Sequence, residues 1–157
     1  MNNKKKIKRG GQWLLSPAAQ HTIFSRETFT DEHRQIEKMV FDFAEDTILP
    51  QVKDIEKLNE DLSRSILLKM GELGLIGVDT PEEYGGTNLD KITACLITEG
   101  VSWGGSASFG CTFGVQTGIG SLGIVFFGTE EQKKKYLPKL NSGCLLYTSD
   151  AADDGHS

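Results

Sequence analysis

Apolar residues recur at intervals of three and four along the first half of the chain, as on one face of a helix. Thr30, followed by the acidic Asp31 and Glu32, suits the N-cap of the first of these helices. Its predicted buried face holds Ile36, Met39, Val40, Phe43, Ala44, Thr47 and Ile48. Pro50 predicts an end or a kink, after which Val52, Ile55 and Leu58 indicate that the helix resumes.

Two further helices follow. One runs near residues 61–73, with Leu62, Ile66, Leu67 and Met70 facing inward; the other begins near Asn88 or Asp90 and carries Ile92, Leu96 and Ile97 toward Val101. Glycine inside a helix costs about 1 kcal/mol relative to alanine, so we expect an early end at Gly100. No useful stretch alternates with the period of a strand. The pattern predicts an all-α fold.

Residues 104–128 contain no charged side chain, and three interpretations compete for them. A membrane-spanning helix needs about 20 apolar residues, but this run holds eight glycines and six Ser, Thr or Gln residues, which disfavours a membrane span. A dinucleotide site is suggested by residues 118–123, which read G-x-G-x-x-G. That motif needs a strand before it and an acid about 20 residues later. Both are missing, so we interpret it as coincidental.

The third interpretation is a fully buried helix, or helix pair, with a face of small residues. Gly110, Gly114 and Gly118 are spaced four apart and therefore stack on one side. The groove that they leave admits either a neighbouring helix at close range or an extended ligand. The spacing alone leaves both open.

Composition narrows the class of protein. The 157 residues suffice for one domain with a real core, and the net charge of −5 argues against nucleic acid as a partner. The basic cluster at residues 4–9 is not followed by the apolar segment of a secretory signal. Cys95, Cys111 and Cys144 have neither disulfide-framework nor zinc-site spacing, which favours a reducing cytoplasm.

Two motifs are more specific than periodicity. Residues 128–143 read G-T-E-E-Q-K-K-K-Y-L-P-K-L-N-S-G, where Thr129 and Gln132 can form a capping box at a helix start. Residues 71–86 read G-E-L-G-L-I-G-V-D-T-P-E-E-Y-G-G, where Gly74 suits a left-handed helix end and Pro81 prevents the helix from continuing.

Both motifs, in this order, closely resemble the N-terminal helical domain of acyl-CoA dehydrogenases. The resemblance covers roughly residues 10–143 and predicts an arm at 1–26, that domain at 27–143, and a tail at 144–157 that does not resemble the family and is expected to be artefactual or disordered. It implies a truncated FAD-dependent enzyme that desaturates fatty acyl-CoA in β-oxidation, transfers electrons to an electron-transfer flavoprotein or a similar acceptor, and forms a homo-oligomer.

The resemblance also implies site residues. In this family the uncharged helix lines the acyl channel, which here points to Gly114, Gln116, Thr117, Gly118, Gly120 and Gly123. Residues 114–117 resemble the medium-chain branch, whereas residues 122–143 resemble bacterial and very-long-chain relatives. The family's glutamate base and most of its flavin contacts lie beyond residue 143, so no catalytic residue is assigned and we expect the chain alone to be inactive. The alternative is a standalone helical module that binds a lipid or a partner helix through the glycine groove.

Overall fold

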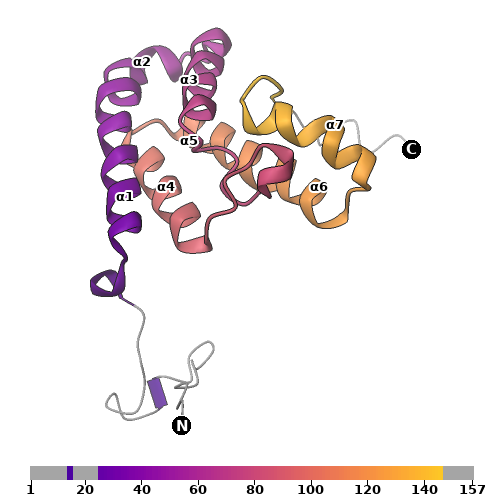
Figure 1. Ribbon diagram of the computed structural model, residues 1–157. Coiled ribbons are helices and arrows are strands. Elements are labelled where there is room, and N and C mark those ends of the chain that lie inside the picture. Colours follow the sequence, from indigo (N-terminus) through magenta and orange to yellow (C-terminus); the bar gives the residue numbers. More distant parts are fainter. Residues whose placement is uncertain (1–13, 16–24, 147–157) are drawn as a thin grey trace.

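The computed structural model describes residues 14–15 and 25–146, and every longer regular element within them is a helix (Figure 1). This confirms the predicted all-α class. The α-helices are α1 (Asp31–Phe43), α2 (Val52–Ile55), α3 (Glu60–Glu72), α4 (Lys91–Trp103), α5 (Ala107–Gly114), α6 (Ser121–Phe127) and α7 (Glu130–Asn141).

Helix α1 begins where the sequence predicts, because the Thr30 hydroxyl accepts a hydrogen bond from the His33 N–H. At its far end the chain passes through a π-helical turn, η4 (Ala44–Ile48), and a 3-10 turn, η5 (Leu49–Gln51), which contains Pro50. Helical structure then resumes in α2, which confirms the predicted interruption and resumption around the proline.

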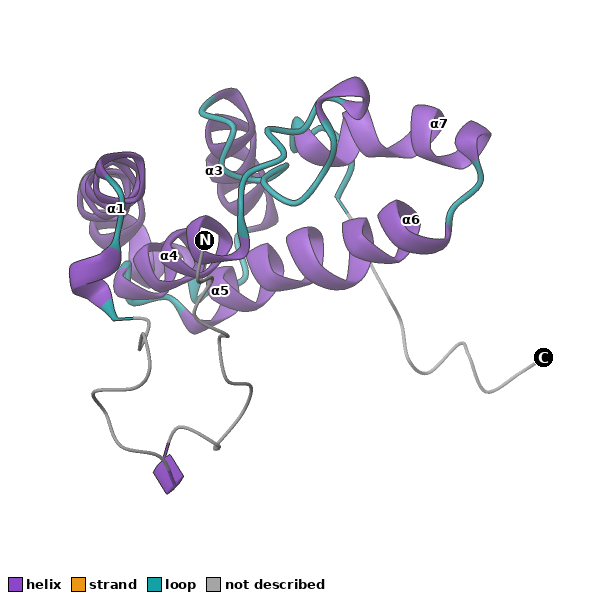
Figure 2. Ribbon diagram, turned by 60° about the horizontal axis from the view of Figure 1, so that its bottom comes forward, coloured by secondary structure: helices purple, strands orange, loops and turns teal. Residues whose placement is uncertain are grey.

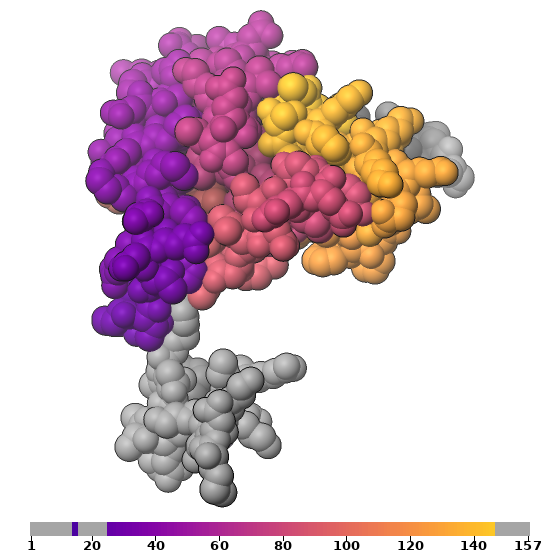
Figure 3. Space-filling model, viewed as in Figure 1, coloured from indigo at the N-terminus to yellow at the C-terminus, as the bar shows by residue number. Residues whose placement is uncertain are grey.

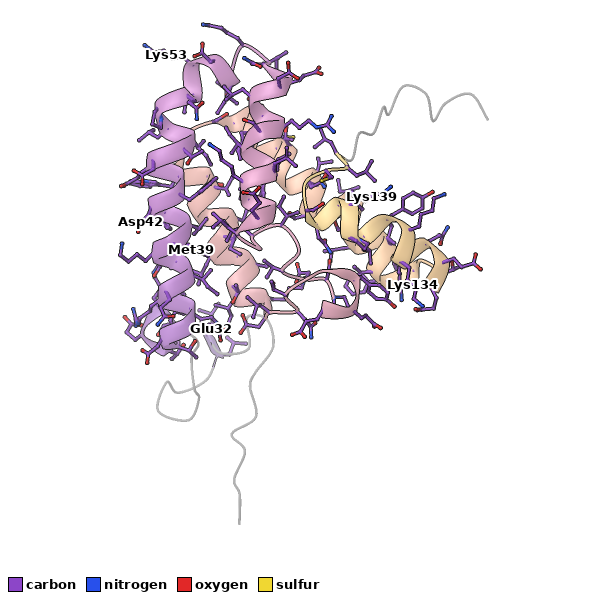
Figure 4. The ribbon with its side chains drawn as sticks, turned by 45° about the horizontal axis from the view of Figure 1, so that its top comes forward. Glu32, Met39, Asp42, Lys53, Lys134 and Lys139 are labelled. Carbon is purple, nitrogen blue, oxygen red and sulfur yellow. The ribbon has the colours of Figure 1, made fainter. Side chains whose placement is uncertain are left out.

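The buried face of α1 is narrower than its apolar pattern suggests. Val40, Ala44 and Ile48 are fully buried in the core, whereas Phe43 packs against its edge and is only half-buried. Met39, labelled on α1 in Figure 4, is 36% exposed, so its prediction as a buried residue was wrong.

Helix α4 packs along α1 and starts at the Asp90 N-cap. The predicted early end at Gly100 was wrong, because the helix continues to Trp103. Gly100 is where α4 approaches Val40 of α1, and the missing side chain makes room for that contact. The helical cost of glycine is therefore offset by packing.

The uncharged segment forms one continuous helical run, Ala107–Phe127, in which α5 and α6 are joined by the π-helical turn η7 (Val115–Gly120). Helix α7 folds back beside α6 (Figure 2). The run has the length and apolar composition that crossing a membrane requires, although these two properties alone are weak evidence of a span. The prediction of a fully buried helix was wrong, since Ile119 and Phe126 are exposed and Phe127 is 88% exposed.

The loop between α3 and α4 lies between the N-terminal helices and α7 (Figure 3). Tyr84 of this loop packs with Leu137 and Leu140 of α7 in a small second apolar cluster. The Asn141 amide, which accepts a hydrogen bond from the Thr80 hydroxyl and donates one to the Tyr84 carbonyl, joins the two segments.

The expected arm and tail lie largely outside the described residues, which leave out residues 1–13, 16–24 and 147–157. Leu14 and Leu15 are exposed, so the structure does not show them docked. Leu146 packs against the main core.

Candidate functional site

A pocket of about 230 Å³ lies between the loop after α3, helix α4 and the long helical run. The loop that follows Gly74 supplies its buried side, where Leu75, Ile76 and Val78 are almost inaccessible to solvent. The pocket is lined by Leu75, Ile76, Val78, Asp79, Ala94, Ile97, Thr98, Phe113, Gly114, Thr117, Gly118 and Leu122.

Two glycines of the long helical run keep this pocket open. A Cβ atom added to Gly114 or to Gly118 would meet no atom within 4 Å. In the described part of the chain the glycine face therefore borders free space instead of a closely packed neighbouring helix. Within the described residues, no neighbouring helix packs closely against Gly114 or Gly118.

The hydroxyl groups of the pocket are already engaged. Thr117 donates to the Phe113 carbonyl at 2.9 Å, and Thr98 donates to the Ala94 carbonyl at 2.9 Å. Each bond lies within the threonine's own helical run, so neither hydroxyl proton is left for a ligand. The lining is therefore more apolar than its composition suggests.

Asp79 is the single ionisable side chain among the lining residues. Its Oδ1 accepts a hydrogen bond from the Lys91 ammonium at 2.6 Å. The Asp79 side chain is 19% exposed, whereas that of Lys91 is 65% exposed, so the ammonium approaches the carboxylate from the solvent side. The pocket thus carries one carboxylate at its edge.

Only some of the predicted channel residues meet in this pocket. Gly114, Thr117 and Gly118 line it together. Gly123 instead borders a second hollow of about 320 Å³ between α6 and α7, with Phe127 and Tyr136. Gly120 is buried and lines neither hollow.

Gln116 also lies outside the pocket. Its side chain is fully buried, and its amide donates to the carbonyls of Leu140 at 2.9 Å and of Leu145 at 2.8 Å. The Ser121 hydroxyl donates to the Gln116 carbonyl at 2.7 Å, which satisfies a backbone acceptor in the π-helical turn. In this structure Gln116 therefore fastens the end of α7 to the long helical run and does not line this pocket, and its role in an acyl channel stays a prediction.

Sequence reasoning missed the lining residues from the loop and from α4. Leu75, Ile76 and Val78 belong to the 71–86 motif, whose glycines and proline predict only a helix end and a turn. The apolar run Leu75, Ile76 and Val78, interrupted only by Gly77, was the signal that could have placed them at a buried wall.

The G-x-G-x-x-G match at residues 118–123 is coincidental, as interpreted, because it lies within η7 and α6, with helix α5 before it. The pocket contains no basic side chain to pair with a pyrophosphate, and its apolar lining offers few donors for a polar cofactor.

Residues 30–144 match the family described as acyl-CoA dehydrogenase, N-terminal domain. The chain therefore belongs to the acyl-CoA dehydrogenase family, which confirms the resemblance seen in its two motifs. A probable acyl-CoA dehydrogenase of Bacillus subtilis is 50% identical over 137 residues, which are 87% of this chain and 23% of that protein.

Solved structures agree with this assignment. An acyl-CoA dehydrogenase of Bacillus anthracis complexed with FAD is 48% identical with a TM-score of 0.75, over 79% of this chain and 21% of that one. An electron transferring flavoprotein of Acidaminococcus fermentans is 32% identical with a TM-score of 0.66, over 80% of this chain and 32% of that one. The chain thus spans less than a third of the length of each of these relatives.

Proposed function

We propose that this chain forms one wall of the acyl-chain pocket of an FAD-dependent acyl-CoA dehydrogenase that introduces an α,β double bond into fatty acyl-CoA. The observation that carries the proposal is the pocket beside Gly114 and Gly118, which is apolar and open at the glycines. Family membership supplies the class of reaction, and the pocket supplies the part of the substrate that this chain would hold.

The lining suits an alkyl chain for a physical reason. Each methylene group removed from water contributes about 0.8 kcal/mol, so a pocket with engaged hydroxyls and a buried aliphatic wall retains a chain without specific polar contacts. The missing side chains at Gly114 and Gly118 let the ligand lie close to the helix backbone. The methylene groups buried along this lining favour medium-to-long acyl chains over short ones.

The chemical step would depend on groups that the described residues do not hold. FAD, when bound, accepts the hydride that leaves the substrate β-carbon. The side chains of this pocket would bind the acyl chain, orient it and exclude water, and we assign none of them as a base. Asp79 is paired with Lys91 and lies at the pocket edge, so we do not propose it for proton abstraction.

The wider setting is part of the same proposal. We propose that the complete enzyme acts in fatty-acid β-oxidation in the cytoplasm, as a homo-oligomer that passes electrons to an electron-transfer flavoprotein or a similar acceptor. The likeness to the Acidaminococcus flavoprotein supports a flavin-linked electron-transfer setting.

A chimaera tests the proposal. Residues 30–144 would replace the matching segment of the Bacillus subtilis relative, and the purified protein would be assayed for bound FAD and for dye reduction by acyl-CoA substrates of increasing length. We expect FAD retention and activity on medium-to-long chains. A folded chimaera that holds FAD but oxidises no acyl-CoA would reject the function, and saturable binding of free lipid by the 157-residue chain would favour the standalone module.

A further inference from the structure

We propose that Asp79 is a specificity-determining residue that makes the pocket reject acyl chains ending in a carboxylate. The inference deepens the proposed function and depends on it, since it concerns which acyl-CoA the same pocket accepts. It rests on the place of one carboxylate in a lining that otherwise carries no charge.

The position of the Asp79 carboxylate is fixed by its ion pair with Lys91. Its Oδ1 is 2.6 Å from Lys91 Nζ, and its side chain is the more buried partner of that pair. Lys91 is mostly in water and does not line the pocket, so water screens its pairing with the carboxylate and Asp79 remains the single ionisable side chain of the lining. A second carboxylate brought into the pocket would lie near a like charge.

The remaining lining gives such a chain end no compensation. The Thr98 and Thr117 hydroxyls donate to backbone carbonyls of their own helices. No arginine, lysine or histidine lines the pocket. A carboxylate entering it would lose its hydration without gaining a donor, whereas a methyl-ended chain would lose nothing polar. Discrimination therefore combines repulsion by Asp79 with desolvation.

Lys91 offers the competing interpretation. If this ammonium turned toward the pocket, it would attract a terminal carboxylate, and the pair would select for such chains. The short contact with Asp79 and the solvent exposure of Lys91 favour rejection. The two interpretations give opposite results in the unmodified protein, where attraction by Lys91 predicts a preference for carboxylate-ended chains and repulsion by Asp79 predicts a preference for methyl-ended ones.

The experiment uses the FAD-containing chimaera and pairs of acyl-CoA substrates of equal length, one ending in a methyl group and the other in a carboxylate. Asp79→Asn is expected to raise kcat/KM for the carboxylate-ended substrate, relative to its methyl-ended partner, by about tenfold or more. Lys91→Gln is expected to lower the same ratio. Asp42→Asn is the matched control, because Asp42 is also paired with a lysine, Lys38, but lies on the outer side of α1, and the ratio should not change (Figure 4).

A second measurement, of the same kcat/KM ratio at increasing ionic strength, uses the unmodified chimaera and so does not depend on whether a variant folds. Rising ionic strength should partly relax the rejection of the carboxylate-ended substrate and leave the methyl-ended one unaffected. An unchanged ratio in Asp79→Asn, or a parent that prefers the carboxylate-ended substrate and loses that preference as ionic strength rises, would overturn the role of Asp79. Absence of turnover with methyl-ended substrates in the parent would instead overturn the proposed function.

Discussion

A Cβ atom added to Gly100 of α4 would lie 2.5 Å from Cγ1 of Val40 on α1, so the two helices meet at a distance that only glycine allows. Val40 is fully buried, and its β-branched side chain cannot move aside cheaply. Overpacking of this kind costs about 1–3 kcal/mol, which exceeds the roughly 1 kcal/mol of helix propensity that alanine would add. We expect Gly100→Ala to lower the free energy of unfolding measured in urea.

Gly110→Ala is the matched control for that substitution. Gly110 also lies in a helix, but a Cβ atom there would meet nothing within 4 Å. Alanine should therefore leave stability unchanged or raise it by up to about 1 kcal/mol. Equal changes in unfolding free energy for Gly100→Ala and Gly110→Ala would show that the contact with Val40 is not the reason for glycine at position 100.

Replacement of Gln116 should weaken the attachment of α7. In Gln116→Leu the Leu145 carbonyl loses its amide donor and the Leu140 carbonyl keeps only the Gly143 N–H, and each lost hydrogen bond costs about 0.5–1.5 kcal/mol. The expected loss would be measured as a lower urea midpoint, with faster amide hydrogen exchange in α7. Gln35→Leu, an exposed position on α1, should change the midpoint little. Unchanged exchange in α7 would contradict the fastening role.

Much of the fold could be predicted from the sequence because helix caps and prolines act on the residues beside them. Thr30, Asp90 and Thr129 each cap a helix as their side chains and the residues after them predict. Pro50 marks the interruption between α1 and α2 because its ring and missing N–H act on the chain beside it. These features need no knowledge of what packs against the helix.

The incorrect predictions concern residues whose burial or helical state depends on parts of the chain that are distant in sequence. Gly100 lies inside its helix at the contact with Val40, 60 positions earlier in the chain, and Met39 is 36% exposed although it follows the apolar spacing. The π-helical turn Val115–Gly120, which holds Gln116 and Gly120, is also not encoded in the apolar pattern. Such effects depend on tertiary contacts that helical periodicity cannot encode.

The link between α1 and α4 should make stability depend on acid. The Thr93 N–H, with help from His33, holds the pKa of the Asp90 carboxyl below its usual range. The Thr30 N–H donates to His33 Nδ1, so the ring proton is on Nε2 and donates to Asp90 Oδ2 at 3.0 Å.

Because the folded-state pKa of Asp90 is lowered, its contribution is complete above the unfolded value of about 3.9 and is lost as the pH falls through the folded value. We expect Asp90→Asn to lower stability at pH 7 and to make the dependence on pH between 5 and 3 shallower in urea titrations. Glu72→Gln, at an exposed position, serves as the control. A parallel pH profile for Asp90→Asn and the parent would refute this linkage.

The pocket itself is tested by a bulky side chain at Gly118. Because a side chain there would enter open space, Gly118→Phe should leave the chimaera folded and fill part of the cavity. Loss of two bound methylene groups, at about 0.8 kcal/mol each, lowers kcat/KM roughly tenfold for long acyl-CoA while short substrates are little affected. Gly120→Phe provides the contrast, since Gly120 is buried outside the pocket and overpacking there should reduce the yield of folded protein for every substrate alike. A uniform loss of folded protein at Gly118, with unchanged chain-length preference in what remains, would show that this glycine serves packing and not the acyl chain.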